Sequence, residues 1–259
     1  MEPHHPSPVV PSAPHPRPAI ISHRTYVGLF PENSRAGLEA SLATGADAIE
    51  ADVRATRDGH VVLIHDQSLS RTLADPRNID EIDYADLRAL DSLGSASDGP
   101  PPLLEEALAL CAGRARFVID VKQGGIARVI EAILHAYSGR AQTWVWSHDP
   151  DIALECVAAL RGAVDVSLIV RPWAVETWQT AQGMRRAREL GFSGLLFEHP
   201  CVDADLIARA TDAGLALHCG RTNEPEEIAR ILALDPASMC SDFPERALAI
   251  RDRVPAAVE

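Results

Sequence analysis

Residues 48–66 read AIEADVRATRDGHVVLIHD, and the fold prediction rests on this stretch. Residues 48–56 form a largely apolar run with a few charged side chains, which predicts a strand. Asp58-Gly59 is a hairpin-type turn, and the apolar run VVLIH at residues 61–65 predicts another strand directly after it. The stretch therefore predicts a strand, a tight turn and a second strand.

Two acidic side chains lie within the first of these strands. Glu50 and Asp52 are two residues apart, so both point to the same side of the strand. Neighbouring carboxylates repel each other unless a cation or a proton holds them. An exposed acidic face is the alternative, but Ile49 and Val53 flank the pair within an apolar strand. We therefore expect Glu50 and Asp52 to bind a metal ion.

Outward from this stretch, short apolar runs alternate with helical patterns. Upstream, residues 19–24 predict a strand and residues 31–43 a helix. Downstream, strands are expected at residues 117–122, 143–147, 164–170, 194–198, 215–219 and 238–241. Helices are expected at residues 125–137, 150–160, 175–190, 203–213, 225–234 and 244–250. Residues 68–102 are polar and irregular, and they predict a loop or small insertion with a short helix at 83–90.

The alternation of strands and helices indicates the fold class. Repeated strand–helix units imply parallel strands with helical crossovers. About eight such units in roughly 240 residues match a closed (β/α)₈ TIM barrel, here with a short insertion after the second strand region. A doubly wound open sheet is the alternative, but no G-x-G-x-x-G motif follows the first strand, which weakens a dinucleotide-binding fold.

Composition limits the domain organisation and the partners. We place one catalytic domain at residues 19–259 and expect residues 1–18, which are rich in Pro and His, to be a disordered lead-in. A formal net charge of −13 argues against nucleic acid as a partner. No apolar run is long enough to span a membrane, so no stable membrane insertion is expected. Five scattered cysteines without a C-x-x-C pair predict small buried residues in a reducing compartment, and a cytoplasmic location.

Ionisable residues gather at the predicted strand ends, which meet at one face of such a barrel. These residues are His23, Arg24, Glu50, Asp52, His65, Asp66, Asp120, Lys122 and Asp242. A planar guanidinium such as that of Arg24 suits a phosphate oxygen. His23 alone fits a buried core histidine, but its match with His65 at another strand end favours an acid–base pair. Asp120 and Lys122 repeat the two-residue spacing of the acids, with a structural ion pair as the alternative.

Weaker candidates lie near other strand ends. For His148-Asp149, Glu198-His199 and His218 we favour polar loop groups or helix caps over a place in the pocket. Trp173, which follows Arg171-Pro172, is the best candidate for a substrate-binding wall.

A series of spaced motifs resembles the glycerophosphodiester phosphodiesterase family. The motifs are His23-Arg24, Pro31-Glu32-Asn33-Ser34, residues 45–53, residues 56–59, His65-Asp66 with Leu69-Ser70-Arg71-Thr72, and Ser241-Asp242-Phe243-Pro244. The motifs from His23 to Thr72 form an ordered series over about 50 residues, which is far more specific than any single motif, and residues 241–244 echo the closing signature of the family. The resemblance covers essentially the whole predicted barrel and is strongest in its first third.

The resemblance implies an activity and assigns roles. It implies metal-dependent hydrolysis of glycerophosphodiesters, which are small molecules, to glycerol 3-phosphate and an alcohol. His23 and His65 would be catalytic. From their places in the predicted barrel we assign His65 as the acid, since it closes the strand opposite the His-Arg pair, and His23 as the base or nucleophile. Arg24 and Lys122 would bind the substrate. One divalent cation, Mg²⁺ or Ca²⁺ and also Mn²⁺, would be held by Glu50, Asp52 and Asp120.

The sequence departs from the family pattern at several positions. The family's Gly after His-Arg is Thr25, its usual Glu metal ligand is Asp120, and its Trp near the seventh strand is replaced around Cys219-Gly220. Residues 235–238 replace a Gly-Val-Asp-Gly stretch. These changes leave the alcohol moiety open, including a lysophospholipid. A related lyase that forms a cyclic phosphate, or a non-catalytic phosphate-binding barrel, are the alternatives, and the sequence leaves the oligomeric state open.

Overall fold

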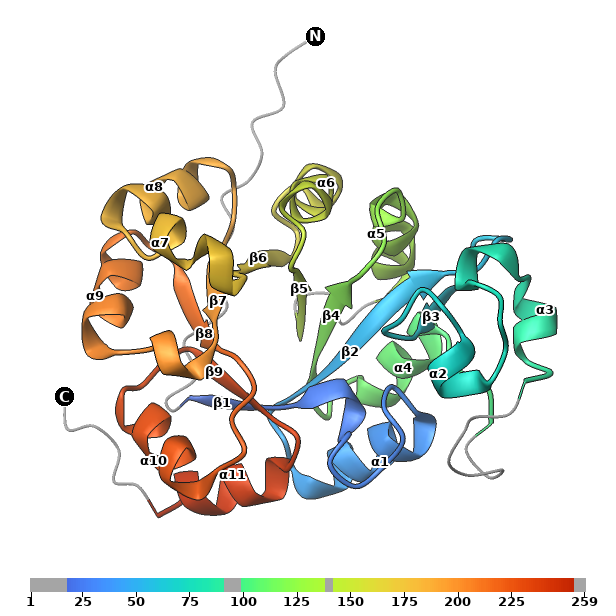
Figure 1. The fold of residues 1–259 in the computed structure, drawn as a ribbon, viewed down its shortest axis with the longest axis horizontal. Coiled ribbons are helices and arrows are strands. Elements are labelled where there is room, and N and C mark those ends of the chain that lie inside the picture. The colour runs from blue at the N-terminus through green and yellow to red at the C-terminus, as the bar shows by residue number, and fades with distance from the viewer. Residues whose placement is uncertain (1–17, 91–98, 138–141, 254–259) are drawn as a thin grey trace, which may run out of the picture.

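The computed structural model describes residues 18–90, 99–137 and 142–253. Within these residues, eight parallel strands form a closed barrel. Strand β1 (Ala19–Ser22) pairs with both β2 (Ala48–Ala55) and β9 (Ser238–Ser241), and this double pairing closes the sheet. In Figure 1 the strands lie at the centre and helices surround them. The predicted (β/α)₈ TIM barrel is confirmed, and the open sheet is excluded.

Helices return the chain from each barrel strand to the next. The other barrel strands are β4 (Arg116–Val121), β5 (Thr143–Ser147), β6 (Asp165–Ile169), β7 (Gly194–Phe197) and β8 (Ala216–Cys219). The outer helices are α1 (Arg35–Thr44), α4 (Leu104–Cys111), α5 (Ala127–Ala136), α6 (Pro150–Leu160), α7 (Val175–Trp178), α8 (Ala181–Glu189), α9 (Ala204–Asp212), α10 (Pro225–Ala233) and α11 (Pro244–Arg251). Consecutive parallel strands joined by helices put every strand's carboxyl end on the same face of the barrel.

Alternation along the strands divides the core into two layers. Ile20 packs outward with the helices, whereas its neighbour Ile21 points into the barrel. The large side chains inside the barrel are Trp144 and Trp146, whose ring centroids lie 6.5 Å apart. Both rings contact His218, at centroid distances of 5.2 and 5.1 Å. These aromatic residues fill the barrel interior, and Trp146 also lines a pocket at the carboxyl ends of the strands.

Strand β3 (Val61–Leu63) is not a barrel strand. It runs antiparallel to β2, with Leu63 opposite Val53, and therefore returns the chain toward the barrel rim. The N–H of Ile64 donates to the carbonyl of Asp52 at 2.9 Å, which brings the following residue, His65, back beside the acidic strand. The predicted hairpin is confirmed, but His65 reaches the site by this return and not from the end of a parallel strand.

The segment after β3 forms a small unit beside the barrel, as predicted. It contains α2 (Ser70–Leu73) and α3 (Tyr84–Leu87), which share a separate apolar cluster. Its buried members are Val62, Ile64, Leu69, Leu73, Ile79, Ile82 and Leu87. The sequence analysis missed α2 and also α4, where the Glu106 carboxylate accepts the N–H of Leu103 at 3.1 Å and supports the first turn.

Two further expectations need correction. The predicted helix at 175–190 is two helices, because Thr180 caps a new start by accepting the Gly183 N–H at 3.0 Å. The predicted strand at 19–24 ends at Ser22. The described cysteines are free, and four of the five are buried, as expected. Residues 1–17 of the expected lead-in lie outside the described residues. In the described part of the chain, no helix has the length and apolar character needed to cross a membrane.

Candidate active site

A pocket of about 240 Å³ opens at the carboxyl ends of the barrel strands. It brings together most of the residues predicted from the sequence. Among the residues that line it are His23, Arg24, Glu50, Asp52, His65, Asp120, Lys122, Trp146, His148, Arg171, Glu198 and Arg221.

A sharp turn after β1 shapes one side of the pocket. Three consecutive non-glycine residues have positive φ angles: Arg24 at 46°, Thr25 at 59° and Tyr26 at 81°. Such angles are costly, above all for a β-branched residue such as Thr25. The turn directs the backbone N–H of Arg24 onto the Glu50 carboxylate at 2.8 Å. Backbone strain at this point therefore fixes the His23-Arg24 segment against the acidic strand.

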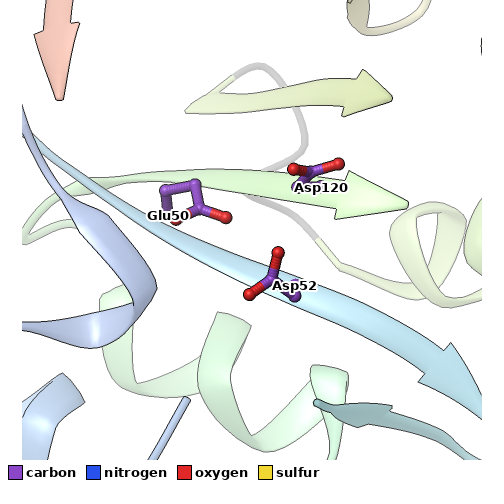
Figure 2. Close-up of side chains that lie close together, drawn as sticks. All are labelled: Glu50, Asp52 and Asp120. Atoms are coloured by element: carbon purple, nitrogen blue, oxygen red, sulfur yellow. The ribbon is translucent and has the colours of Figure 1, made fainter. Parts of the chain in front are cut away.

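Glu50, Asp52 and Asp120 form a buried acidic cluster. Each offers one carboxylate oxygen, and these oxygens all lie within 4.8 Å of one another. Figure 2 shows the three side chains converging from β2 and β4, where Asp52 and Asp120 are register partners. All three are at most 5% exposed. Burial and the charge of Asp52 raise the pKa of Glu50 to about 7, because three adjacent buried carboxylates cannot all stay ionised unaided.

Two cations and an amide contact this cluster. Lys122 Nζ lies 3.1 Å from Asp52 Oδ1 and 2.5 Å from Asp120 Oδ2, and Arg24 Nε lies 3.3 Å from Asp52 Oδ2. Asn33 donates to Asp52 Oδ2 at 3.0 Å. Burial favours a higher pKa for Asp52, but Lys122 and Arg24 outweigh it and the pKa is lowered. Burial, with the charge of Asp52, raises the pKa of Asp120 despite the opposing effect of Lys122.

The donor set fits a hard divalent cation. The ligand atoms are carboxylate oxygens, which Mg²⁺ and Ca²⁺ prefer. Among the described residues, Asp120 Oδ1 is buried without a hydrogen-bond partner, so one lone-pair site on this carboxylate is left for a ligand. Glu50 accepts the Arg24 N–H through Oε2, and this hydrogen bond leaves Oε1 as a further oxygen that can bind a cation.

His23 is held by an aspartate from the opposite end of the chain. Its Nδ1 lies 2.6 Å from Asp242 Oδ1. Because an ionised carboxylate only accepts hydrogen bonds, Nδ1 carries the proton and Nε2 is left for other partners. Asn223 fixes this aspartate by donating to Oδ2 at 2.7 Å and accepting its backbone N–H at 2.9 Å. Burial lowers the pKa of His23, but the Asp242 hydrogen bond and the Glu50 charge outweigh it, so the pKa is raised.

His65 has an aspartate partner of its own. Its Nδ1 lies 2.7 Å from Oδ1 of the next residue, Asp66. Arg71, on α2, donates from Nε to Asp66 Oδ2 at 2.5 Å. Burial favours a higher pKa for Asp66, but Arg71 and His65 outweigh it and lower the pKa to about 2. The carboxylate is therefore charged at any pH near neutrality, and it accepts the hydrogen bond from His65 Nδ1.

Some of the weaker candidates make structural contacts, and others line the pocket. Asp149 caps α6, and His199 lies 3.3 Å from Glu227, as the sequence analysis favoured. His218 lies on β8 and is buried in the barrel core, so it is neither the polar loop group nor the helix cap that was expected. His148 and Glu198 line the pocket instead, so the preference for a plain loop role misplaced these two residues.

Trp173 does not line the central pocket. Its side chain is 79% exposed and borders a separate hollow of about 190 Å³ next to it. The guanidinium carbon of Arg171 lies 5.3 Å from the centre of its ring. Arg171 lines both the hollow and the central pocket, so it lies between Trp173 and the predicted site.

Several supporting residues were not assigned a site role from the sequence. Asn33, Asp66, Arg71 and Asp242 all lie within the quoted motifs, and an acid directly after a histidine, as in His65-Asp66, was the available signal. Asn223 had no comparable signal, because only the fold brings it to Asp242.

Comparisons with known proteins identify the family of this chain. The model of the glycerophosphoryl diester phosphodiesterase family matches residues 23–246. A glycerophosphodiester phosphodiesterase of Caldanaerobacter subterraneus is 25% identical over 239 residues, covering 87% of this chain and 94% of the relative. One of Bacillus altitudinis is 36% identical over 107 residues, covering 40% of this chain and 44% of the relative.

Solved structures share the fold. A structure of a glycerophosphoryl diester phosphodiesterase from Silicibacter pomeroyi has a TM-score of 0.81 at 24% identity, covering 92% of this chain and 94% of that one. A phosphodiesterase of Oleispira antarctica, solved with the product sn-glycerol-3-phosphate, has a TM-score of 0.80 at 22% identity, covering 91% and 97%. The family match over nearly the whole barrel confirms the predicted membership: this chain belongs to the glycerophosphoryl diester phosphodiesterase family and is a phosphoric diester hydrolase.

Proposed function

We propose that this enzyme hydrolyses glycerophosphodiesters to glycerol 3-phosphate and an alcohol, with one divalent cation and two histidines. The observation that carries the proposal is that two aspartate-held imidazoles, of His23 and His65, line the same pocket as a buried carboxylate cluster. The product found in the Oleispira structure supports the same substrate class.

Glu50, Asp52 and Asp120 would hold the cation, either Mg²⁺ or Ca²⁺, with Mn²⁺ as a substitute. When bound, it supplies positive charge that stabilises the negative charge growing on the phosphoryl oxygens. Arg24 contributes a guanidinium on the same side of the pocket. Lys122 lowers the pKa of Asp52, opposes the rise in the pKa of Asp120 and contacts both carboxylates, so in this proposal it supports the phosphate site mainly through these two acids.

The two histidines divide the proton transfers. His23 Nε2 removes a proton from water as the water oxygen bonds to phosphorus. The bond from phosphorus to the alcohol oxygen breaks, and His65 Nε2 donates a proton to that oxygen. The Asp242 carboxylate raises the pKa of His23 and makes its imidazole a stronger base, which supports the assignment of His23 as the base.

A metal-loaded hydrolysis assay tests this function. The purified protein is stripped with a chelator, reloaded with Mg²⁺, Ca²⁺ or Mn²⁺, and offered glycerophosphodiesters and lysophospholipids in ¹⁸O-labelled water. We expect no activity without metal, and glycerol 3-phosphate that carries one ¹⁸O atom after reloading. Full activity in the stripped protein would contradict the metal role.

The same assay separates hydrolysis from cyclisation. If a hydroxyl of the substrate were the nucleophile, a cyclic phosphate without ¹⁸O would appear first, and the enzyme would be a lyase. An enzyme that binds these substrates without converting any of them would overturn the proposed function and favour a binding barrel. His60→Ala is the matched control for the histidine variants, because His60 stacks on Tyr84 outside the pocket.

A further inference from the structure

Arg71 joins two carboxylates that belong to different loops. Its Nε donates to Asp66 Oδ2 at 2.5 Å. Its two terminal nitrogens donate to both oxygens of Glu32, at 2.5 and 3.0 Å. Glu32 lies in the segment between β1 and α1, whereas Asp66 follows β3. One guanidinium on the short helix α2 therefore ties together two segments that line the pocket.

Each of these carboxylates in turn holds a residue of the proposed machinery. Asp66 accepts from Nδ1 of His65 at 2.7 Å. Glu32 accepts from a terminal nitrogen of Arg24 at 3.3 Å. Arg71 itself is absent from the lining of the central pocket, although both His65 and Arg24 line it. It lines a neighbouring hollow of about 280 Å³ instead, and its hydrogen bonds reach the proposed machinery through Asp66 and Glu32.

A plain surface ion pair is the alternative, because exposed pairs contribute little to stability. Two features distinguish Arg71 from such a pair. Its planar fork binds Glu32 at two points, a geometry that a lysine cannot reproduce. Glu32 is also only 12% exposed, although the Arg71 side chain is 51% exposed. Burial of one partner makes the loss of the other costly, because a charged group is left without compensation.

The same segment contains a matched control. Arg77 makes the same kind of two-point contact with Asp75, at 2.9 and 2.7 Å. Neither Arg77 nor Asp75 lines the central pocket, and within the described residues their side chains make no hydrogen bond to His65 or Arg24. Arg71 and Arg77 thus make the same type of contact, but only the partners of Arg71 hold residues of the proposed machinery.

We propose that Arg71 is a positioning residue: it fixes Asp66 against His65 and Glu32 against Arg24, so that helix α2 aligns the general acid with the phosphate-binding arginine. The inference rests on the proposed function. Without Arg71, Asp66 loses its second partner and is free to turn away from His65. Glu32 loses its main partner and competes with the substrate phosphate for Arg24.

Kinetics of the metal-loaded variants test the proposal. On glycerophosphocholine, Arg71→Ala is expected to lose on the order of ten- to a hundredfold in kcat/KM, the usual range for partners that orient a functional group. On a nitrophenyl phosphodiester, whose leaving group hardly needs a proton, the loss should be smaller because only the Arg24 contact contributes. Arg71→Lys should recover only part of the activity, and Arg77→Ala should stay within about twofold of the wild type.

A double-mutant cycle shows whether Arg71 acts through Asp66. If it does, the double variant Asp66→Asn/Arg71→Ala should have nearly the same kcat/KM on glycerophosphocholine as Asp66→Asn alone. The part of the loss that also appears on the nitrophenyl substrate is subtracted before this comparison. Independent, multiplicative losses would overturn the proposal. So would an Arg71→Ala enzyme as active as Arg77→Ala. If Arg71→Ala does not fold, Arg71→Lys takes its place, and equal losses on both substrates would then be the contradicting result.

A proton NMR measurement separates this inference from the proposed function. The Nδ1 proton of His65, bonded to a carboxylate, should give a strongly downfield signal that disappears in His65→Ala. We expect the signal to weaken or shift in Arg71→Ala and to stay in Arg77→Ala. A wild type that cleaves no glycerophosphodiester would overturn the proposed function alone, whereas an unchanged signal in Arg71→Ala would overturn the positioning role alone.

Discussion

The two histidines of the pocket have the same partner type but very different surroundings. His23 and Asp242 are 219 residues apart in sequence, and their side chains are 19% and 13% exposed. His65 and Asp66 are chain neighbours, and their side chains are 32% and 28% exposed. Closure of the barrel between β1 and β9 assembles the first pair. The small unit beside the barrel supports the second pair through Arg71.

The groups behind the two aspartates also differ. Asp242 is held by Asn223, a neutral amide, with Arg221 further away at 3.8 Å. Asp66 is held by the guanidinium of Arg71 at 2.5 Å. A carboxylate that is ion-paired with a guanidinium stabilises positive charge on its histidine less than a carboxylate that is held by a neutral amide. In the proposed mechanism this difference prepares the two imidazoles for opposite proton transfers, and the following variants test it.

The largest effects are expected from removing the imidazoles. His23→Ala should lose on the order of a hundredfold or more on every substrate, since the base is needed whatever the leaving group. His65→Ala should lose as much on glycerophosphocholine but far less on a nitrophenyl phosphodiester. Steady-state kinetics on both substrates provide the measurement, with His60→Ala as control. The reverse pattern would exchange the two roles, and small losses everywhere would make both pairs structural.

Asp120 lies outside both pairs, so its removal should not discriminate between the two substrates. Asp120→Asn should weaken metal affinity on the order of ten- to a hundredfold while changing the melting temperature little. A metal titration followed by activity, beside a thermal melt, measures both quantities. An unchanged titration would show that Asp120 serves only as the ion-pair partner of Lys122.

The aspartates themselves give the next effect. The hydrogen bond and charge of Asp242 raise the pKa of His23 against its burial, so Asp242→Asn should lower that pKa. Because a base works only when unprotonated, the acid limb of the kcat/KM profile should move to lower pH, with roughly tenfold less activity at the plateau. Asp66→Asn should leave this limb in place. A shift of the same limb in both variants would contradict the division between base and acid.

A third histidine tests what a carboxylate partner contributes. His218 is buried with its Nδ1 2.8 Å from Ser238 Oγ, and no carboxylate in the described part of the chain pairs with it. Burial together with Arg116 lowers its pKa to about 3. Above pH 6.5 it is neutral whether folded or unfolded. Below pH 6.5 only the unfolded chain takes up the proton, so the free energy of unfolding decreases as the pH is lowered, by about 2 kcal/mol at pH 5.

The raised pKa of His23 acts in the opposite direction. Its folded form binds the proton more tightly than the unfolded form, so this contribution to stability is present at low pH and is lost as pH rises through the folded pKa. Urea unfolding of the wild type, His218→Gln and His23→Ala at pH 7 and pH 5 measures both effects. We expect the His218 variant to lose less stability on acidification than the wild type and the His23 variant to lose more. Equal pH dependence in all three would contradict the assigned directions.

Local pattern was sufficient for much of the fold and for the reactive groups. The spacing of Glu50 and Asp52, the Asp58-Gly59 turn and the alternation of strands with helices are short-range features, and they predicted the barrel and its acidic pair correctly. Such features are determined by neighbours in the chain, because strand pleat and helix pitch repeat every few residues. The helix α4 and the break at Thr180 were missed, since a cap within a helical pattern is a weak local signal.

Only the tertiary structure decided how the reactive groups are supported. The antiparallel return of β3 places His65, barrel closure brings Asp242 to His23, and docking of α2 brings Arg71 to Glu32. Barrel closure and the docking of α2 join segments that are far apart in the chain, so their separation in sequence says nothing about their distance in space. The sequence therefore determined which residues are candidates for the chemistry, whereas chain closure and packing determined that Asp242 holds His23 and that Arg71 supports Asp66 and Glu32.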